Sequence, residues 1–181
     1  MKKWMLAGAA ALTIALSALT PAQAEYKSEH RGGTMRLVAR SAAGTLDPQI
    51  NYTLQYWQIY QSVYSGLTAF KKGAGEAGFE VVPNLAEELP AASNDGKTYT
   101  FELKPGLKFA SGNALTAEDV VYSLQRAVLL DKTPAFILTQ FGFSKENVKD
   151  KIKQTGPLTV TLEVDKEYAP TFVYNCLTAN M

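Results

Sequence analysis

Two different hydrophobic periods follow each other between residues 94 and 126, and they restrict the fold more than any other stretch. Lys97–Leu103 alternates polar side chains with aromatic and aliphatic ones, which is typical of a strand with one buried face. Asn94-Asp-Gly96 before it favours a tight hairpin turn, because Asp-Gly readily adopts positive φ. After a second turn at Pro105-Gly106, apolar residues recur every three or four positions, which indicates a helix. The chain therefore mixes strands and helices, in an α/β or α+β class.

The predicted helix has a clear start signal at Thr116. Its side chain can accept backbone N–H groups of the first turn, while Glu118 and Asp119 lie near the positive end of the helix dipole. The pattern is close to a capping box, with Asp in place of Glu at the third position. One buried face is predicted from Val120, Val121, Leu124, Ala127 and Val128.

The first half of the chain carries weaker signals of the same kind. Met35–Ala39 alternates and is predicted to be the first strand. Leu46-Asp-Pro48 is predicted to end it in a turn, because a residue before proline avoids helical backbone angles. Leu54–Leu67 is apolar at steps of three and four, which predicts a helix with Gly66 near its end.

The remaining elements are predicted from turn signals and alternation. A loop or hairpin tip is expected at residues 70–78, followed by a strand at Phe79–Val82. Residues 152–164 are expected to form a hairpin that turns at Gly156-Pro157. The last helix is expected at Tyr168–Leu177, where a proline is tolerated in the first turn.

The N-terminus predicts export. Two lysines precede the apolar run Met5–Leu19, and Pro21-Ala-Gln-Ala24 offers small residues at the −3 and −1 positions. This pattern indicates a secretory signal peptide at residues 1–24, cleaved after Ala24. The apolar run is too short to span a bilayer comfortably. We therefore expect a periplasmic protein that begins with a flexible lead-in at residues 25–32.

The charge balance excludes some classes of partner. The 18 Lys and Arg residues fall to 16 without the two lysines of the signal peptide, against 17 Asp and Glu residues. A net charge near zero gives no reason to expect nucleic acid or an anionic membrane surface as partner. A single cysteine, Cys176, cannot form an internal disulfide. We expect a monomer without a cofactor.

The sequence offers no catalytic constellation. His30, the sole histidine, lies in the polar lead-in, where no rigid pocket for a general base is expected. Cys176 lies among apolar residues and is expected to pack rather than react. Gly73-Ala-Gly75-Glu-Ala-Gly78 matches the dinucleotide-binding fingerprint, but a strand follows where a helix is required, so we interpret it as a flexible loop. The sequence therefore predicts neither an enzyme nor a metal site.

Five aromatic side chains lie between residues 52 and 64. Trp57, Tyr60 and Tyr64 have helical spacing and are expected to face a core. Tyr52 and Tyr56 fall off that stripe. Aromatic faces with polar tips suit a cleft that wraps varied ligands, so these two side chains are candidates for ligand contact.

Several motifs, in order and at compatible spacing, resemble those of the family 5 extracellular solute-binding proteins, which capture peptides, nickel chelates and related solutes for ABC importers. The motifs are Gly33-Thr-Met-Arg-Leu37, Leu46-Asp-Pro48, Tyr64-Ser-Gly-Leu67, Asn84-Leu-Ala-Glu-Glu-Leu-Pro90 and the block at residues 94–126. The resemblance covers nearly all of residues 33–180. It departs from the family at Ser111-Gly112, where an Asp-Gly pair is usual, and at Lys104, where an arginine is usual. Both departures concern structure more than ligand.

The resemblance implies an architecture. It is an α/β lobe like those of the periplasmic binding proteins (type II, family 5), incomplete, with an extra α+β subdomain. Residues 33–68 would form the first part of lobe I, residues 69–175 the family-specific subdomain, and residues 176–181 the return to lobe I. The second lobe would be absent, so we expect an N-terminal fragment, and we expect residues 25–181 alone to bind ligand weakly or not at all.

The resemblance also implies a site and partners. In the family, the segment after the Asp-Pro turn runs along the ligand cleft, which places Tyr52, Thr53 and Leu54 there, with Asn180 as a further candidate. An extended backbone can pair with a peptide as an added strand. The implied function is capture of a peptide or small-molecule solute by lobe closure, followed by delivery to an inner-membrane ABC permease.

Two other functions stay open on the sequence alone. An exported hydrolase would need a nucleophile with its base or a metal cluster, and the lone terminal histidine argues against both. A stand-alone envelope interaction module would keep only the subdomain and would fold by itself without a large exposed apolar face. The sequence names neither the solute nor the permease.

Overall fold

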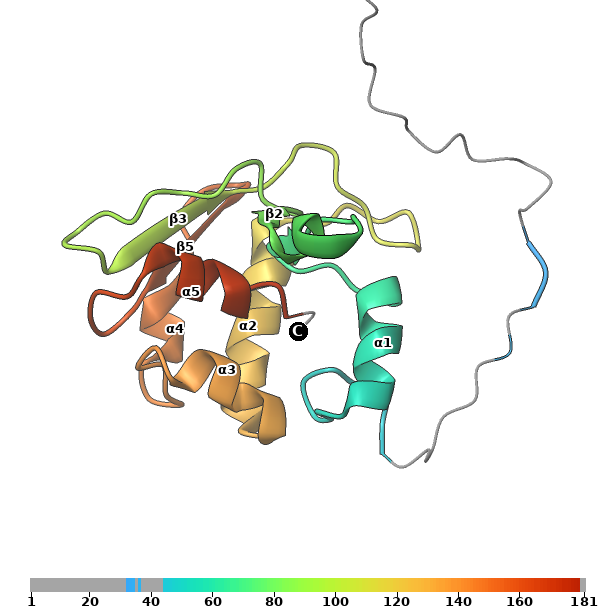
Figure 1. The fold of residues 1–181 in the computed structure, drawn as a ribbon. Helices are drawn as coiled ribbons and strands as arrows, with labels where there is room; N and C mark the ends of the chain where they lie inside the picture. The colour runs from blue at the N-terminus through green and yellow to red at the C-terminus, as the bar shows by residue number, and fades with distance from the viewer. Residues whose placement is uncertain (1–31, 35, 37–43, 180–181) are drawn as a thin grey trace, which may run out of the picture. The chain divides into compact units, whose positions relative to one another are not determined.

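The computed structural model describes residues 32–34, 36 and 44–179. The chain divides into two units, Met1–Val38 and Ala39–Met181. The described helices and strands all belong to the second unit, and they run from α1 to α5 as labelled in Figure 1.

Some predictions fall outside the described residues. These are the signal peptide at residues 1–24, the lead-in at residues 25–32 apart from Gly32, and the strand at Met35–Ala39 apart from Arg36. They stay predictions.

Three antiparallel strands form the larger sheet. β3 (Thr98–Glu102), β4 (Ile152–Gln154) and β5 (Thr159–Glu163) lie in the order β3-β5-β4. β4 and β5 are the two arms of the predicted hairpin, which is thereby confirmed. On the outer side of β3, Glu87 donates its backbone N–H to the Glu102 carbonyl at 2.8 Å.

The sheet has one apolar and one polar face, as the alternation predicts. On β3, Tyr99 and Phe101 are buried and lie opposite Leu162 and Val160 of β5. The other face carries threonine and glutamate side chains that are exposed or half-buried. The helix α2 (Ala117–Leu130) packs against β4 and β5, and the core lies between this helix and the apolar face (Figure 1).

The predicted turn before β3 is confirmed. Asn94, Asp95 and Gly96 have φ of 51°, 53° and 77°. Asn and Asp tolerate positive φ better than other residues with a side chain, so the sequence matches the geometry. Ser93 and Thr98 close the turn by exchanging backbone hydrogen bonds at 2.9 and 3.0 Å.

The start of α2 also follows its sequence signal. Thr116 donates its backbone N–H and its hydroxyl to Asp119 Oδ2, both at 2.8 Å, and the capping box is complete. Asp119 therefore takes the role that Glu usually has at the third position of a capping box. The predicted buried face is confirmed, except that Val121 is only half-buried.

We expect the substitution Asp119→Ala to lower the free energy of unfolding by about 1 kcal/mol, because the first turn of α2 loses its reciprocal cap. Urea denaturation followed by circular dichroism measures this difference. The neighbouring substitution Glu118→Ala removes a carboxylate that is exposed and lies in the same turn. If the two variants lose equal stability, the dipole rather than the capping box accounts for the effect.

The short helices were not predicted. They are η3 (Thr133–Ala135), α3 (Phe136–Thr139) and α4 (Val148–Lys151), each too short to show a helical period. The last helix, α5 (Pro170–Cys176), begins two residues later than predicted, with the proline in its first turn.

The strand predicted at Phe79–Val82 begins two residues later and ends one residue later in the structure. β2 spans Val81–Pro83 and pairs antiparallel with β1 (Thr68–Phe70), which the sequence did not reveal. The tip between them is not an irregular loop, as the sequence predicts, but contains a five-residue 3-10 helix, η2 (Gly75–Phe79).

α1 (Leu54–Val63) ends four residues before the predicted end at Leu67. Tyr64 already has extended backbone angles, φ −114° and ψ 158°. The chain leaves the helix because its next residues pair with a distant segment: the Leu67 carbonyl accepts the backbone N–H groups of Asn84 and Ala86 at 3.0 and 3.1 Å. Tertiary pairing here overrides the helical spacing of the apolar residues.

Candidate functional site

Residues 45–51, which we call the Asp47 loop, form a turn held by its own polar groups. The Asp47 carbonyl accepts the backbone N–H groups of Ile50 and Asn51, both at 3.1 Å. The Asp47 carboxylate accepts the Gln49 N–H at 2.9 Å, and the Asn51 side-chain amide donates to the Thr45 carbonyl at 3.1 Å. The turn predicted from the Asp-Pro pair is therefore confirmed.

Arg126 of α2 binds this loop. Its Nη1 and Nη2 donate to the two carboxylate oxygens of Asp47 at 3.2 and 2.7 Å, and Nη1 also donates to Gln49 Oε1 at 2.5 Å. The hydrogen bonds from Arg126 hold the pKa of Asp47 below its usual value, although burial works in the opposite direction. Asp47 is therefore ionised at neutral pH, and the ion pair is intact there.

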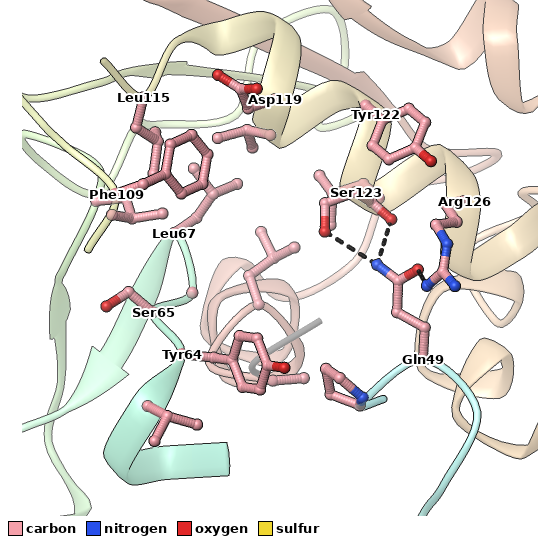
Figure 2. Close-up of a pocket in the computed structure, with 18 of the residues that line it drawn as sticks. Gln49, Tyr64, Ser65, Leu67, Phe109, Leu115, Asp119, Tyr122, Ser123 and Arg126 are labelled. Carbon is pink, nitrogen blue, oxygen red and sulfur yellow. Dashed lines mark hydrogen bonds between the residues drawn. The ribbon is translucent and has the colours of Figure 1, made fainter. Parts of the chain in front are cut away.

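Gln49 is buried although it is polar, with 4% of its surface exposed. Its Nε2 donates to the backbone carbonyl of Ser123 at 2.8 Å and to the Ser123 hydroxyl at 2.9 Å (Figure 2). Because its Oε1 accepts from Arg126, both ends of the amide are satisfied, which offsets the cost of burial. The loop also contacts α1, where the Tyr60 hydroxyl donates to the Thr45 carbonyl at 3.1 Å.

A pocket of about 560 Å³ lies beside the Asp47 loop. Tyr64 and Ser65 line one side of it, and Ser123 of α2 lies across from them (Figure 2). The two carboxylates in its lining are both engaged, Asp47 with Arg126 and Asp119 in the capping box. The sequence did not predict this pocket, because its walls come from segments that are far apart in the chain.

The predicted ligand contacts lie at a second, smaller cavity. Tyr52, Thr53 and Leu54 line a space of about 220 Å³ together with Trp57. Tyr52 is 45% exposed and Leu54 is 75% exposed, so their side chains are open to solvent. Asn180, the other predicted contact, lies outside the described residues.

The backbone at this cavity is extended and open. Thr53, the residue before α1, has φ −132° and ψ 147°. Among the described residues, neither the N–H nor the carbonyl of Tyr52 makes a hydrogen bond. The Thr53 carbonyl accepts the Trp57 N–H at 2.9 Å, so Tyr52 is the residue here whose donor and acceptor could pair with an added strand.

The aromatic residues of α1 form a connected group. Tyr60 is fully buried, as predicted, and Trp57 is half-buried. The prediction that Tyr64 faces a core is wrong, because the helix ends before it and the residue is 46% exposed at the larger pocket. The Tyr52 ring makes edge-to-face contacts with Trp57 (5.5 Å between ring centres) and with Phe136 of α3 (5.2 Å).

The other candidates of the sequence carry no site chemistry in the described residues. Cys176 is half-buried and packs against the core, and burial raises the pKa of its thiol, which makes it a poor nucleophile. The Gly73–Gly78 segment lies at the tip of the β1–β2 hairpin and does not open an α-helix, so the fingerprint lacks its context. His30 lies outside the described residues.

Two further properties concern residues 32–34, 36 and 44–179. No group of three or more His, Cys, Asp and Glu side chains there could hold a metal ion. No helix in the same residues has the length and apolar character needed to cross a membrane.

Comparison with known proteins gives a consistent result. A family model described as bacterial extracellular solute-binding proteins, family 5 middle, matches residues 80–180. The chain is 29% identical over 144 residues to the dipeptide-binding protein DppE of Bacillus subtilis, and 32% identical over 130 residues to the probable D,D-dipeptide-binding periplasmic protein DdpA of Escherichia coli. Each alignment covers 72% of this chain, but only 25% of DppE and 23% of DdpA.

Solved structures agree with the sequence relatives. The clavulanic acid biosynthesis oligopeptide binding protein 2 superposes with a TM-score of 0.68 and 25% identity, over 80% of this chain and 28% of that one. The unliganded open form of the murein tripeptide binding protein MppA gives 0.62 and 26%, over 75% and 27%. These neighbours confirm the predicted fold class. The chain spans about a quarter of the length of the relatives it matches.

Proposed function

Because the chain belongs to the bacterial extracellular solute-binding proteins of family 5, we propose that it acts as the solute-capturing component of an ABC import system. It captures a peptide or a similar small solute in the periplasm and delivers it to an inner-membrane permease. Family membership supports the class of function. One local observation carries the choice of ligand, namely the exposed segment at Tyr52 and Thr53, which leads into α1 and is extended at Thr53.

The named ligands of the relatives support a peptide. DppE and DdpA are named for dipeptides, and the two solved neighbours for an oligopeptide and a tripeptide. What these ligands share is a peptide main chain. A site that binds the main chain of the ligand, with little dependence on its side chains, could bind all of them.

We place this proposed site at Tyr52. Its N–H and carbonyl, which bond to no other residue that the structure describes, can form hydrogen bonds to the carbonyl and N–H of a peptide that lies alongside as an added strand. The neighbouring cavity of about 220 Å³, lined by Tyr52, Leu54 and Trp57, can accept one apolar side chain of that peptide. Thr53 and, at the other end of the chain, Asn180 complete the proposed contacts.

The proposed arrangement of the chain follows the family. Residues 33–68 and 176–181 belong to lobe I, and residues 69–175 form the subdomain. The signal peptide is removed after Ala24, and the exported protein works as a monomer. Capture proceeds by lobe closure, so it needs no covalent chemistry, no cofactor and no nucleic acid.

We expect the full-length protein to bind di- and tripeptides with a dissociation constant of about 1 μM. The substitution Tyr52→Ala is expected to weaken that binding about tenfold. Isothermal titration with a panel of peptides and free amino acids measures both. The matched control is Tyr122→Ala, which removes a tyrosine that is 66% exposed on α2 and lines the larger pocket instead.

The two variants separate the possible outcomes. Peptide binding that depends on Tyr122 and not on Tyr52 would place the ligand in the larger pocket and reject the proposed contacts. If no peptide of the panel binds to the unmodified protein, the proposal that the solute is a peptide is wrong.

A further inference from the structure

Two helices from residues 69–175 hold the segment that carries the proposed ligand contacts. α2 binds the Asp47 loop through Ser123 and Arg126, and α3 places the Phe136 ring at 90° against Tyr52. This region provides none of the proposed contacts itself. Its connection to that segment therefore calls for an explanation other than ligand binding.

We propose that Arg126 is a positioning residue. It fixes where Tyr52–Leu54 lies, and thereby how tightly the site binds a peptide, without touching the ligand. The effect on the peptide rests on the proposed function, whereas the effect on the position of Tyr52 does not.

The geometry of Arg126 suits it for this role. Its planar guanidinium donates to both carboxylate oxygens of Asp47 and to Gln49 Oε1. This arrangement fixes the orientation of the Asp47 loop as well as its distance from α2. Ser123, which accepts both N–H groups of the Gln49 amide, lies one turn earlier on the same face of α2. The Asp47 loop is thus held against one helical face at two successive turns.

Loss of this side chain would leave charged and polar groups without partners. The Asp47 carboxylate would lose its counter-charge. The Gln49 Oε1 would lose its hydrogen-bond donor while it stays buried, because Gln49 is only 4% exposed. Unpaired groups of this kind drive rearrangement towards water. The loop would therefore leave its place on α2 rather than stay there unpaired.

A shift of the loop must reach the proposed site. Tyr52 follows Gln49 by three residues, a connection that spans at most about 10 Å when fully extended. Ile50 and Asn51 between them are tied back to the Asp47 carbonyl, so this connection has little slack. The Tyr52 ring also contacts Phe136, and a displaced loop would change that edge-to-face contact.

The test compares three variants of the protein as its gene encodes it. Arg126→Met removes the charge, and Arg126→Lys keeps the charge but loses the fork. Lys151→Met is the matched control, because Lys151 forms an ion pair with Glu163 at nearly equal exposure, 34% against 32%, away from the Asp47 loop. Thermal unfolding shows whether each variant is folded at the temperature of the measurements.

Two readouts follow the position and the binding separately. The emission of Trp57, obtained by subtracting the spectrum of a Trp57→Phe protein, reports on its ring contact with Tyr52 without any ligand. Titration with the tightest dipeptide of the panel gives the dissociation constant. We expect Arg126→Met to move the Trp57 emission and to weaken binding about tenfold or more, Arg126→Lys to give an intermediate change, and Lys151→Met to change neither.

Opposite results would overturn the inference. If Arg126→Met is folded and keeps both the emission and the dissociation constant of the unmodified protein, Arg126 does not position the site. Should Arg126→Met fail to fold, Arg126→Lys decides in the same way. A protein that binds no dipeptide contradicts the proposed function, and in that case the Trp57 emission alone still decides whether Arg126 positions Tyr52.

Discussion

Replacing Phe101 by alanine is expected to lower the free energy of unfolding by about 3–5 kcal/mol, the largest loss expected from any single substitution considered for this chain. Phe101 is fully buried in β3, where it lies opposite Val160 and belongs to the main core cluster. Truncation removes its buried apolar surface and leaves a cavity that the sheet can fill only in part. Since domains are typically stable by about 5–15 kcal/mol, the variant would be close to unfolded.

The matched control for this prediction is Phe79→Ala. Phe79 is 79% exposed at the end of η2, so removing its ring should change stability by no more than about 0.5 kcal/mol. Urea denaturation of both variants, followed by circular dichroism, gives the difference directly. Equal losses in the two variants would show that the sheet and α2 do not form the core described above.

Gly66→Ala is expected to lower the free energy of unfolding by about 1–3 kcal/mol, because the added methyl group has no room. A Cβ atom at residue 66 would lie 2.6 Å from the Leu177 carbonyl oxygen and 3.1 Å from the Thr68 carbonyl oxygen. Both are backbone atoms, which cannot turn aside as a side chain can. The segment after α1 would have to separate from the segment after α5, and with it one wall of the larger pocket would move.

Gly73→Ala separates this crowding from the general effect of replacing a glycine. A Cβ atom at residue 73 would meet the Ala77 Cβ at 3.4 Å, which is ordinary contact. Neither glycine has positive φ, so alanine is allowed at both by its backbone angles. We expect Gly73→Ala to leave the free energy of unfolding unchanged or to raise it slightly, because alanine lowers the conformational entropy of the unfolded chain. A destabilisation as large as that of Gly66→Ala would mean that contact with Leu177 is not the cause.

The elements that were predicted well are those whose signal is local. The alternation of Lys97–Leu103, the turn at Asn94-Asp-Gly96 and the cap at Thr116 each depend on a few adjacent residues, and the structure confirms all three. α1 shows the limit of such reasoning. Its apolar spacing continues to Leu67, but pairing of residues 66–68 with residues 83–86 ends the helix at Val63, and no local pattern announces that pairing.

The candidate site was accessible to sequence reasoning only in part. Tyr52, Thr53 and Leu54 were placed at a ligand cleft by resemblance, and their position at an exposed cavity agrees with that placement without testing it. The roles of Gln49 and Arg126 were missed, because their hydrogen-bond partners, Ser123 and Asp47, lie 74 and 79 positions away in the sequence. The Asp-Pro turn and Arg126, in the C-terminal half of the capped helix, were both visible in the sequence, but nothing in the sequence pairs them.

The two edge strands of the larger sheet, β3 and β4, differ in what covers their outer sides. The outer side of β3 is covered by the chain itself, where Glu87 bonds to Glu102 and Lys104 to Leu85. The outer side of β4 is partly covered, because the Ile152 N–H donates to the Val148 carbonyl and the Ile152 carbonyl accepts the Gln125 side-chain amide at 2.8 Å. β4 is also only three residues long and carries the exposed Lys153 at its centre. A short edge with a charged side chain offers little template to a strand of another molecule. This sheet should therefore resist self-association and fibre growth even where the protein is concentrated.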